Sequence, residues 1–194
     1  MSRQLILASS SPYRRELLAR LELPFETAAP AIDETPAPDE PPRALVERLS
    51  RDKAGALRPR FPHALLIGSD QCVVLDDRIV GKPGTHEQAR SQLLAASGRS
   101  VAVHTGLCLL DAATGVRWED VVSYEIEFRE LDADEIERYL QAERPYDCAG
   151  SVKSEGLGVS LLRHMRGDDP SALVGLPLIR LCDMLRAAGI QVPA

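Results

Sequence analysis

Apolar positions in this chain follow a strand rhythm in some segments and a helical rhythm in others. Leu5–Ala8 and Ala64–Gly68 are short, continuous apolar runs, a pattern typical of strands that are buried on both faces. The segment after the first run gathers leucines from Leu17 to Leu21 on one helical face, and Ser11-Pro12 is a helix-start signal. The chain is therefore predicted to open with a strand, a tight polar turn and a helix.

The rest of the chain alternates between the same kinds of segment. Asp111 to Gly115 supplies turn chemistry between two alternating runs, which predicts a long antiparallel hairpin. Helices between strands, together with such a hairpin, predict an α/β fold with a mixed sheet. We expect further strands at Pro24–Ala29, Cys72–Leu75, Val101–Leu110, Val116–Phe128 and Leu157–Leu162, and further helices at Arg43–Leu57, Thr85–Ala96, Asp132–Ala142 and Leu176–Ala188.

Composition narrows the class of protein only modestly. The 194 residues are 44% hydrophobic and 27% charged, as in a globular protein, so we expect a single domain over residues 1–194 that could be elongated into two lobes. The net charge of -6 argues against a nucleic acid polymer as partner. The four cysteines form no CxxC pair, and the first apolar run is too short for a signal peptide or a membrane span. We therefore expect a cytoplasmic protein with reduced thiols and no membrane partner.

The polar turn after the first strand has the groups of an anion-binding site. Ser9 to Ser11 offer hydroxyls and backbone N–H groups where a strand passes into a helix, and the helix N-terminus adds partial positive charge. Arg14 or Arg15, one turn into the helix, can add a bidentate contact to a phosphate. The alternative is a serine-capped helix with exposed arginines, because serine caps are common.

Acidic side chains occur in two segments that could bind a metal cation or activate a water molecule. Asp33-Glu34 lies in a loop rich in proline and acid, residues 30–42, and paired carboxylates can hold Mg²⁺ or Mn²⁺. Asp70 ends a buried strand, where α/β folds present reacting groups, so it could ligate metal or act as a general base. The alternative for Asp33-Glu34 is a solvated acidic loop. The alternative for Asp70 is a turn aspartate that bonds its own backbone.

Two lysines and a glycine-bearing segment complete the candidate groups. Lys53 and Lys82 could neutralise a polyphosphate and stabilise charge that develops in a transition state. Residues 148–158 are rich in small side chains that let a ligand approach the backbone, and Glu155 among them could accept hydrogen bonds from a base. The alternative for Lys53 and Lys82 is that they are surface lysines. The alternative for residues 148–158 is a turn between two secondary-structure elements.

Taken in order, these segments resemble the Maf family of nucleotide pyrophosphatases, also called septum formation inhibitors. The resemblance covers nearly the whole chain and implies an elongated α/β fold related to inosine triphosphate pyrophosphatases, with a cleft between two lobes. It also implies a homodimer and metal-dependent hydrolysis between the α- and β-phosphates, which gives a nucleoside monophosphate and pyrophosphate. The segments that carry it are LILASSSPYRRELL, the DE of AIDETP, the lysine of RDKA, IGSDQ, GKP, HTGL, CAGSVKSEGLG and LVGLPL.

Residue roles follow from the same resemblance. Asp70 would be the general base, and Glu34 and Asp70 would lie near a divalent cation, Mg²⁺ or Mn²⁺. Lys53 and Lys82 would also offset the charge that builds up in the transition state. The phosphates would be held by Ser9, Arg14, Lys53 and Lys82.

The resemblance is to the branch of 7-methyl-GTP pyrophosphatases, on the strength of Tyr13, Gln71 and Glu155. N7 methylation gives guanine a positive charge that favours the aromatic face of Tyr13, although that branch often carries Trp there. Glu155 could accept hydrogen bonds from guanine N1–H and the 2-amino group. The alternatives are a dTTP/UTP pyrophosphatase, whose branch usually has Arg, Thr and Gln at these positions, and a nucleotide-binding regulator of septum formation without catalysis.

Overall fold

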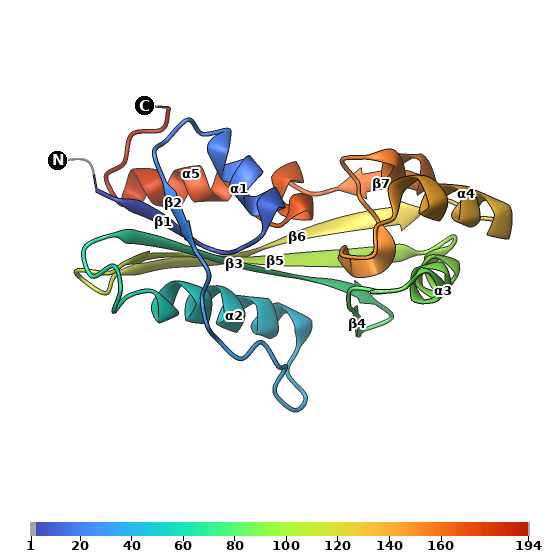
Figure 1. The fold of residues 1–194 in the computed structure, drawn as a ribbon, viewed down its shortest axis with the longest axis horizontal. Helices are drawn as coiled ribbons and strands as arrows, with labels where there is room; N and C mark the ends of the chain where they lie inside the picture. Colours follow the sequence, from blue (N-terminus) through green and yellow to red (C-terminus); the bar gives the residue numbers. More distant parts are fainter. Residues whose placement is uncertain (1–2, 194) are drawn as a thin grey trace. The chain divides into compact units, whose positions relative to one another are not determined.

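The computed structural model describes residues 3–193, and its strands form one mixed sheet (Figure 1). Within these residues seven strands are arranged in the order β2-β1-β3-β5-β6-β7, with β4 paired to β3. β1 is parallel to β2 and β3, whereas β3–β4 and β6–β7 are antiparallel pairs. The strands are β1 (Leu5–Ala8), β2 (Glu26–Ala28), β3 (Leu65–Leu75), β4 (Arg78–Val80), β5 (Ser100–Asp111), β6 (Arg117–Phe128) and β7 (Leu162–Arg166).

Helices alternate with these strands along the chain, so the predicted α/β class with a mixed sheet is confirmed. No helix of the described residues is long and apolar enough to cross a membrane. The helices are α1 (Pro12–Ala19), α2 (Pro42–Ala56), α3 (His86–Ala96), α4 (Ala133–Glu143) and α5 (Leu178–Ala187), with short 3-10 segments η1 (Ala149–Ser151), η2 (Leu157–Leu161) and η3 (Pro170–Val174).

The described chain divides into two compact units. The first comprises the described residues of Met1–Gln71, Thr105–Val122 and Asp169–Ala194, and the second comprises Cys72–His104 and Ser123–Asp168. Strands β3, β5 and β6 each contribute residues to both units. The expected single domain, the cleft between lobes and the relation to inosine triphosphate pyrophosphatases stay predictions.

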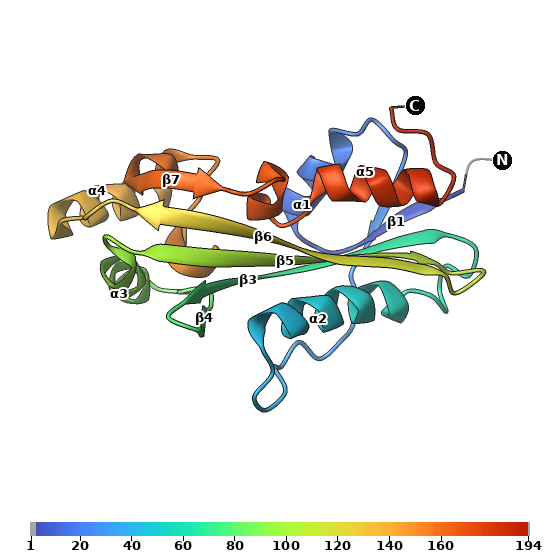
Figure 2. The same ribbon diagram turned by 180° about the vertical axis from the view of Figure 1, so that it is seen from behind.

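The first unit has an apolar cluster on each face of its strands, which explains the continuous apolar runs in the sequence. Successive strand residues point to opposite faces, so odd-numbered and even-numbered positions enter different clusters. Leu5, Leu65 and Ile67 pack with side chains of α1 and α5, whereas Ile6 and Leu66 pack with the α2 side chain of Ala54. Helices α1 and α5 therefore cover one face and α2 covers the other (Figures 1 and 2).

Two glycines let α2 lie unusually close to the strands beneath it. A Cβ atom at Gly68 would stand 1.9 Å from the Ser50 carbonyl oxygen, and one at Gly106 would stand 2.1 Å from the Val46 carbonyl oxygen. Neither position has room for a side chain, because the atoms in the way belong to the helix backbone. The last residues of α2, including Lys53, are thereby held directly over β3.

The second unit packs α3 and α4 against each other, with η1 on α3 and η2 on α4 (Figure 1). The predicted helices at Thr85–Ala96 and Asp132–Ala142 are confirmed to within a residue or two at their ends, and Thr85 and Asp132 cap them. β4 was not predicted from the sequence. It is a three-residue strand beside β3, after an Asp76-Asp77 turn.

The strand predicted at Leu157–Leu162 is wrong. Leu157–Leu161 is the 3-10 segment η2, and strand β7 begins at Leu162. Its apolar alternation does not mark a buried face, because Leu157 and Val159 are exposed. Gly158 allows the turn instead, since a Cβ atom there would stand 2.4 Å from the Lys153 carbonyl oxygen.

The contact of α2 with the strands predicts opposite effects at two glycines. Gly68→Ala should destabilise the protein by about 1–3 kcal/mol or more, because the new methyl group has to push α2 away. Gly55→Ala is the matched control, since a Cβ atom at Gly55 meets nothing within 4 Å. Alanine at that helical position should stabilise by up to about 1 kcal/mol. Urea unfolding of both variants measures the difference, and equal values would contradict close packing of α2.

Candidate active site

The expectation that Asp70 ends a strand is wrong, because β3 continues from Leu65 to Leu75 and Asp70 lies in its middle. This part of β3 presents polar side chains to both faces of the sheet. Ser69 and Gln71 share the face on which η3 lies, and Asp70 between them points to the face covered by α2. Ser69 and Asp70 are both buried. The period of two in a strand therefore separates Asp70 from its two polar neighbours.

Asp70 forms a buried ion pair with Lys53 of α2. The Lys53 Nζ atom lies 2.6 Å from Asp70 Oδ1 and 3.1 Å from Glu34 Oε1. The Lys53 residue is only 5% exposed, so its ammonium group needs these carboxylates as counterions. The structure thus brings together Glu34, Lys53 and Asp70, which are far apart in sequence and were each singled out from it.

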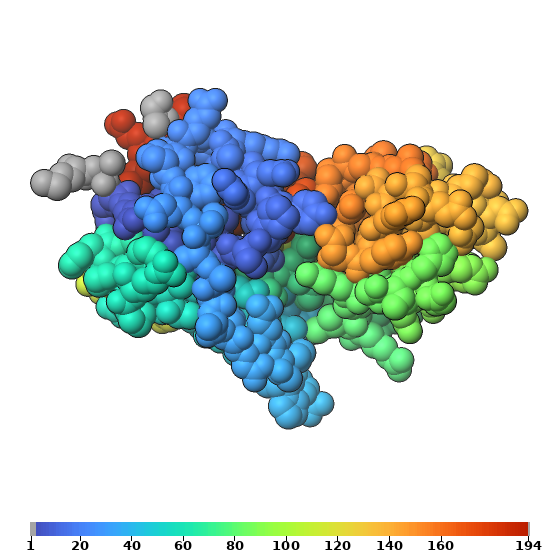
Figure 3. All heavy atoms as spheres, viewed as in Figure 1, coloured from blue at the N-terminus to red at the C-terminus, as the bar shows by residue number. Residues whose placement is uncertain are grey.

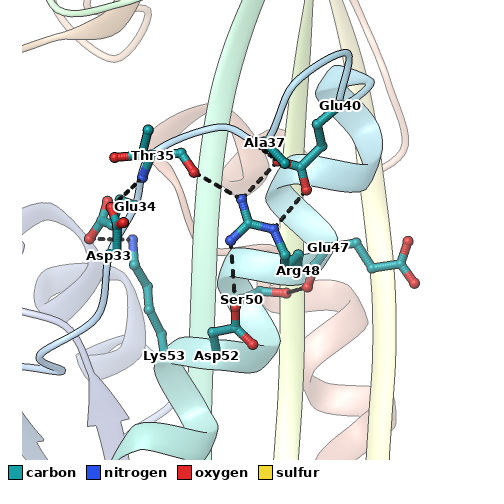
Figure 4. A network of polar contacts seen from close by, with 10 residues as sticks. All are labelled: Asp33, Glu34, Thr35, Ala37, Glu40, Glu47, Arg48, Ser50, Asp52 and Lys53. Atoms are coloured by element: carbon teal, nitrogen blue, oxygen red, sulfur yellow. Dashed lines mark hydrogen bonds and ion pairs between the residues drawn. The ribbon is translucent and has the colours of Figure 1, made fainter.

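Glu34 comes from the loop before α2, which projects from the first unit (Figures 1 and 3). The two acids of this loop have different environments. Asp33 Oδ1 accepts a hydrogen bond from the backbone N–H of Thr35 at 2.9 Å. The side chain of Thr35 and, after it, this backbone N–H lower the pKa of Asp33. Glu34 instead points toward Lys53 (Figure 4). Of the pair, Glu34 is the acid that faces the buried lysine.

Arg14 of α1 approaches the same group of charges. Its Nε atom donates to the carbonyl oxygen of Gly175 at 2.8 Å, and Ser69 Oγ lies 2.9 Å from that oxygen. Burial lowers the pKa of Arg14, and the carboxylates of Asp70 and Glu34 oppose that shift. The positively charged side chains of Arg14 and Lys53 therefore both interact electrostatically with the carboxylates of Asp70 and Glu34.

Gln71 is bonded to η3. Its Nε2 atom lies 2.6 Å from the carbonyl oxygen of Ala172 and 3.1 Å from that of Leu173, and it lies 3.2 Å from Thr105 Oγ1. The amide nitrogen of Gln71 thus holds the segment that ends in the Gly175 turn. Its predicted role toward a nucleotide base stays a prediction.

The serine turn opens onto a pocket of about 450 Å³ in the first unit. Ser9 is buried and its Oγ atom accepts from the backbone N–H of Ser11 at 3.1 Å, while Ser11 caps α1. Tyr13, in the first turn of α1, is half-buried. The pocket is lined by Ser9, Ser10, Ser11, Pro12, Arg15, Glu16, Ala19 and Thr27.

Lys82 and Glu155 lie in the second unit, on two exposed loops. Gln92 of α3 joins these loops. Its Nε2 atom donates to the Gly81 carbonyl oxygen at 3.0 Å, and its Oε1 atom accepts from Ser151 Oγ at 2.5 Å. The loop of Lys82 and the glycine-bearing segment of Glu155 are therefore fixed to one helix.

Three supporting residues were missed by the sequence analysis: Gln92, Arg48 and Asp169. Asp169 is buried, and its Oδ2 atom accepts from the backbone N–H of Ile179 in α5 at 2.7 Å. Asp169 before Pro170 was a readable helix-start signal. Gln92 and Arg48 gave no such signal, because their partners lie in other segments of the chain.

Glu34 and Asp70 are the carboxylates of the candidate site that could serve as ligands of a divalent cation. Within residues 3–193 no group of three or more His, Cys, Asp or Glu side chains could hold a metal. Glu34 and Asp70 offer carboxylate oxygens, which Mg²⁺ prefers as ligands, but in this structure both contact the Lys53 ammonium, at 3.1 Å and 2.6 Å. Mg²⁺ is commonly bound through one or two carboxylates together with substrate phosphates, so a cation at these two side chains stays a prediction.

Comparison with known proteins assigns the chain to a family. Residues 4–188 match the family described as Maf-like protein, and this span includes every residue of the candidate site. The chain therefore belongs to the Maf family, as the ordered segments of the sequence suggested.

Three curated relatives of this chain carry the name 7-methyl-GTP pyrophosphatase. The protein of that name from Pseudomonas syringae pv. tomato is 59% identical over 189 residues, which cover 97% of this chain and 98% of the relative. That from Nitrosococcus oceani is 56% identical over 188 residues, or 97% and 94% of the two chains. That from Polaromonas sp. is 54% identical over 191 residues, or 98% and 87%.

The buried ion pair predicts unequal costs for its two members. Lys53→Met should lower the free energy of unfolding by about 3–5 kcal/mol, because it leaves the Asp70 carboxylate buried without its ion-pair partner. Asp70→Asn should cost less, about 1–2 kcal/mol, since Lys53 keeps Glu34 as a partner. Urea denaturation at neutral pH compares the two variants. A larger loss for Asp70→Asn would contradict this account of the charges.

Proposed function

We propose that the protein is a nucleoside triphosphate pyrophosphatase that hydrolyses the α–β phosphoanhydride bond of 7-methyl-GTP. The products are then 7-methyl-GMP and pyrophosphate. The observation that supports the chemistry best is the Glu34–Lys53–Asp70 arrangement, in which one buried ammonium lies within 3.1 Å of two carboxylates. The substrate is supported by relatives at 54–59% identity that bear the name 7-methyl-GTP pyrophosphatase.

Asp70 is the general base in this proposal. Its buried carboxylate, oriented by Lys53 at 2.6 Å, takes a proton from the water that attacks the α-phosphorus. Lys53 and Arg14 offset the negative charge that develops on the phosphates, and Lys82 contributes a further cation. A divalent cation, Mg²⁺ or Mn²⁺, held by Glu34 and Asp70 would supply Lewis-acid polarisation of a phosphoryl oxygen.

Base selection is assigned in this proposal to three side chains. The ring of Tyr13 offers a face to the positively charged 7-methylguanine, and the carboxylate of Glu155 accepts its N1–H and 2-amino groups. Gln71 is the third side chain, and its amide nitrogen holds η3. Ser9 belongs to the phosphate-binding turn. We further propose a cytoplasmic protein that acts on small nucleotides, and a homodimer that sedimentation analysis would detect.

Pyrophosphate release from a panel of triphosphates tests the proposed substrate. The panel holds 7-methyl-GTP, GTP, dTTP, UTP, CTP and ATP, each with Mg²⁺, with Mn²⁺ and with a chelator. We expect metal-dependent turnover that is fastest on 7-methyl-GTP. Fastest turnover of dTTP or UTP would refute the proposed base recognition and keep the chemistry. Nucleotide binding without turnover of any member would favour the non-catalytic regulator.

The role of Asp70 is tested by Asp70→Asn. The amide cannot accept the proton from water, so kcat should fall by about 10²–10⁴-fold. Asp77→Asn is the matched control, because Asp77 is an exposed turn residue with φ 59° and asparagine tolerates that left-handed conformation. Initial rates at saturating 7-methyl-GTP give both values. Near-normal turnover by Asp70→Asn would refute the assignment of the base.

A further inference from the structure

The loop that carries Glu34 has little support from its own backbone. Residues 30–42 include five prolines, which have no N–H group to donate, and residues 29–37 form neither helix nor strand. The side chain of Glu34 is 56% exposed even though one of its oxygens reaches the buried Lys53. A segment of this kind keeps one conformation only when side chains hold it.

Arg48 of α2 is the side chain that holds this loop (Figure 4). Its Nε and Nη2 atoms lie 2.7 Å from the two carboxylate oxygens of Glu40, which is a bidentate pair. Nη2 also donates to the carbonyl oxygen of Thr35 at 3.2 Å. Asp52, one turn further along α2, lies 3.6 Å from Nη1 and orients the guanidinium from its own helix.

These contacts fix the backbone next to Glu34. Thr35 is bonded on both sides, since its N–H donates to Asp33 Oδ1 and its carbonyl oxygen accepts from Arg48. The far end of the loop is fixed as well, because Glu40 Oε2 accepts from the backbone N–H of Ala37 at 3.0 Å. Arg48 lowers the pKa of Glu40 to about 2, so the carboxylate stays ionised at neutral pH.

We propose that Arg48 is a positioning residue for the reaction. Its hydrogen bonds to the Thr35 carbonyl oxygen and the Glu40 carboxylate, here called the Arg48 clamp, keep the Glu34 carboxylate beside Lys53 and Asp70. Arg48 acts through the loop backbone and not on the reacting atoms. The inference rests on the proposed function, because it assumes that Glu34 serves hydrolysis in the way described above.

The variants that test the clamp are Arg48→Met, Arg48→Lys and Glu40→Gln. Methionine removes both the charge and the guanidinium group that bonds the two oxygens of Glu40, whereas lysine keeps the charge but cannot make the bidentate pair. Arg51→Gln is the matched control, since Arg51 lies on the same helix and its ion pair with Glu119 is long, at 3.9 Å. We expect the defect to rank Arg48→Met first, followed by Arg48→Lys and Glu40→Gln, with Arg51→Gln like the wild type.

The first readout needs neither metal nor nucleotide. Hydrogen–deuterium exchange of peptides covering residues 33–40 in the free protein should accelerate about tenfold or more in Arg48→Met, since local opening exposes the loop amides. Peptides from β3 serve as an internal reference and should be unchanged. Wild-type exchange over residues 33–40 in Arg48→Met would overturn the proposal.

The second readout is kinetic and uses Glu34→Gln. Misplacing a group by about an ångström can cost roughly 10²-fold, so Arg48→Met should lose about 10- to 100-fold in kcat and need more metal for half-maximal rate. The double variant should be no slower than Glu34→Gln alone, because both changes remove one interaction. Fully additive losses would overturn the proposal.

The outcomes separate this inference from the proposed function. A defective Glu34→Gln beside a fully active Arg48→Met overturns the role of Arg48 and leaves the hydrolase standing. A fully active Glu34→Gln variant would refute the role that the proposed function gives to Glu34. It would then also refute the positioning role of Arg48, which depends on Glu34.

Discussion

The close approach of α2 to the sheet is the constraint on which the candidate site depends. Gly68 and Gly106 remove the side chains that would hold the helix off, and the helix then brings Lys53 to 2.6 Å from Asp70. A buried lysine with its counterion so near is a consequence of backbone packing as much as of charge. Glu34 joins the pair only because α2 also provides Arg48, which holds the loop in front of it.

Much of the first unit could be predicted because its signals are local. The apolar runs at Leu5–Ala8 and Ala64–Gly68 identify strands buried on both faces, and Ser11-Pro12 identifies the start of α1. The strand expected at Leu157–Leu162 failed because alternation alone cannot tell a buried face from an exposed turn. There Gly158 has no room for a side chain beside the Lys153 carbonyl oxygen, which a count of apolar positions ignores.

The candidate site could be predicted only in part, for a similar reason. Asp70 and Lys53 were found because an acid directly after an apolar run and lysines in motifs are recognisable residue by residue, and the structure joins them, although Asp70 lies within β3 and not at a strand end. Arg48 and Gln92 act through carbonyl oxygens and side chains 8 to 59 residues away, so no local pattern reveals them. Supporting residues of this sort follow from the fold and have to be read from it.

The alternation of side chains in the middle of β3 has a consequence for which substitutions and insertions the protein can accept. Ser69 and Gln71 hold the Gly175 turn and η3 on one face, while Asp70 meets Lys53 on the other. Substitutions of Ser69 or Gln71 therefore leave the direct contact between Asp70 and Lys53 in place. The strand itself has no such freedom in length, because one inserted residue between Leu65 and Asp70 would turn Asp70 away from Lys53 and toward η3.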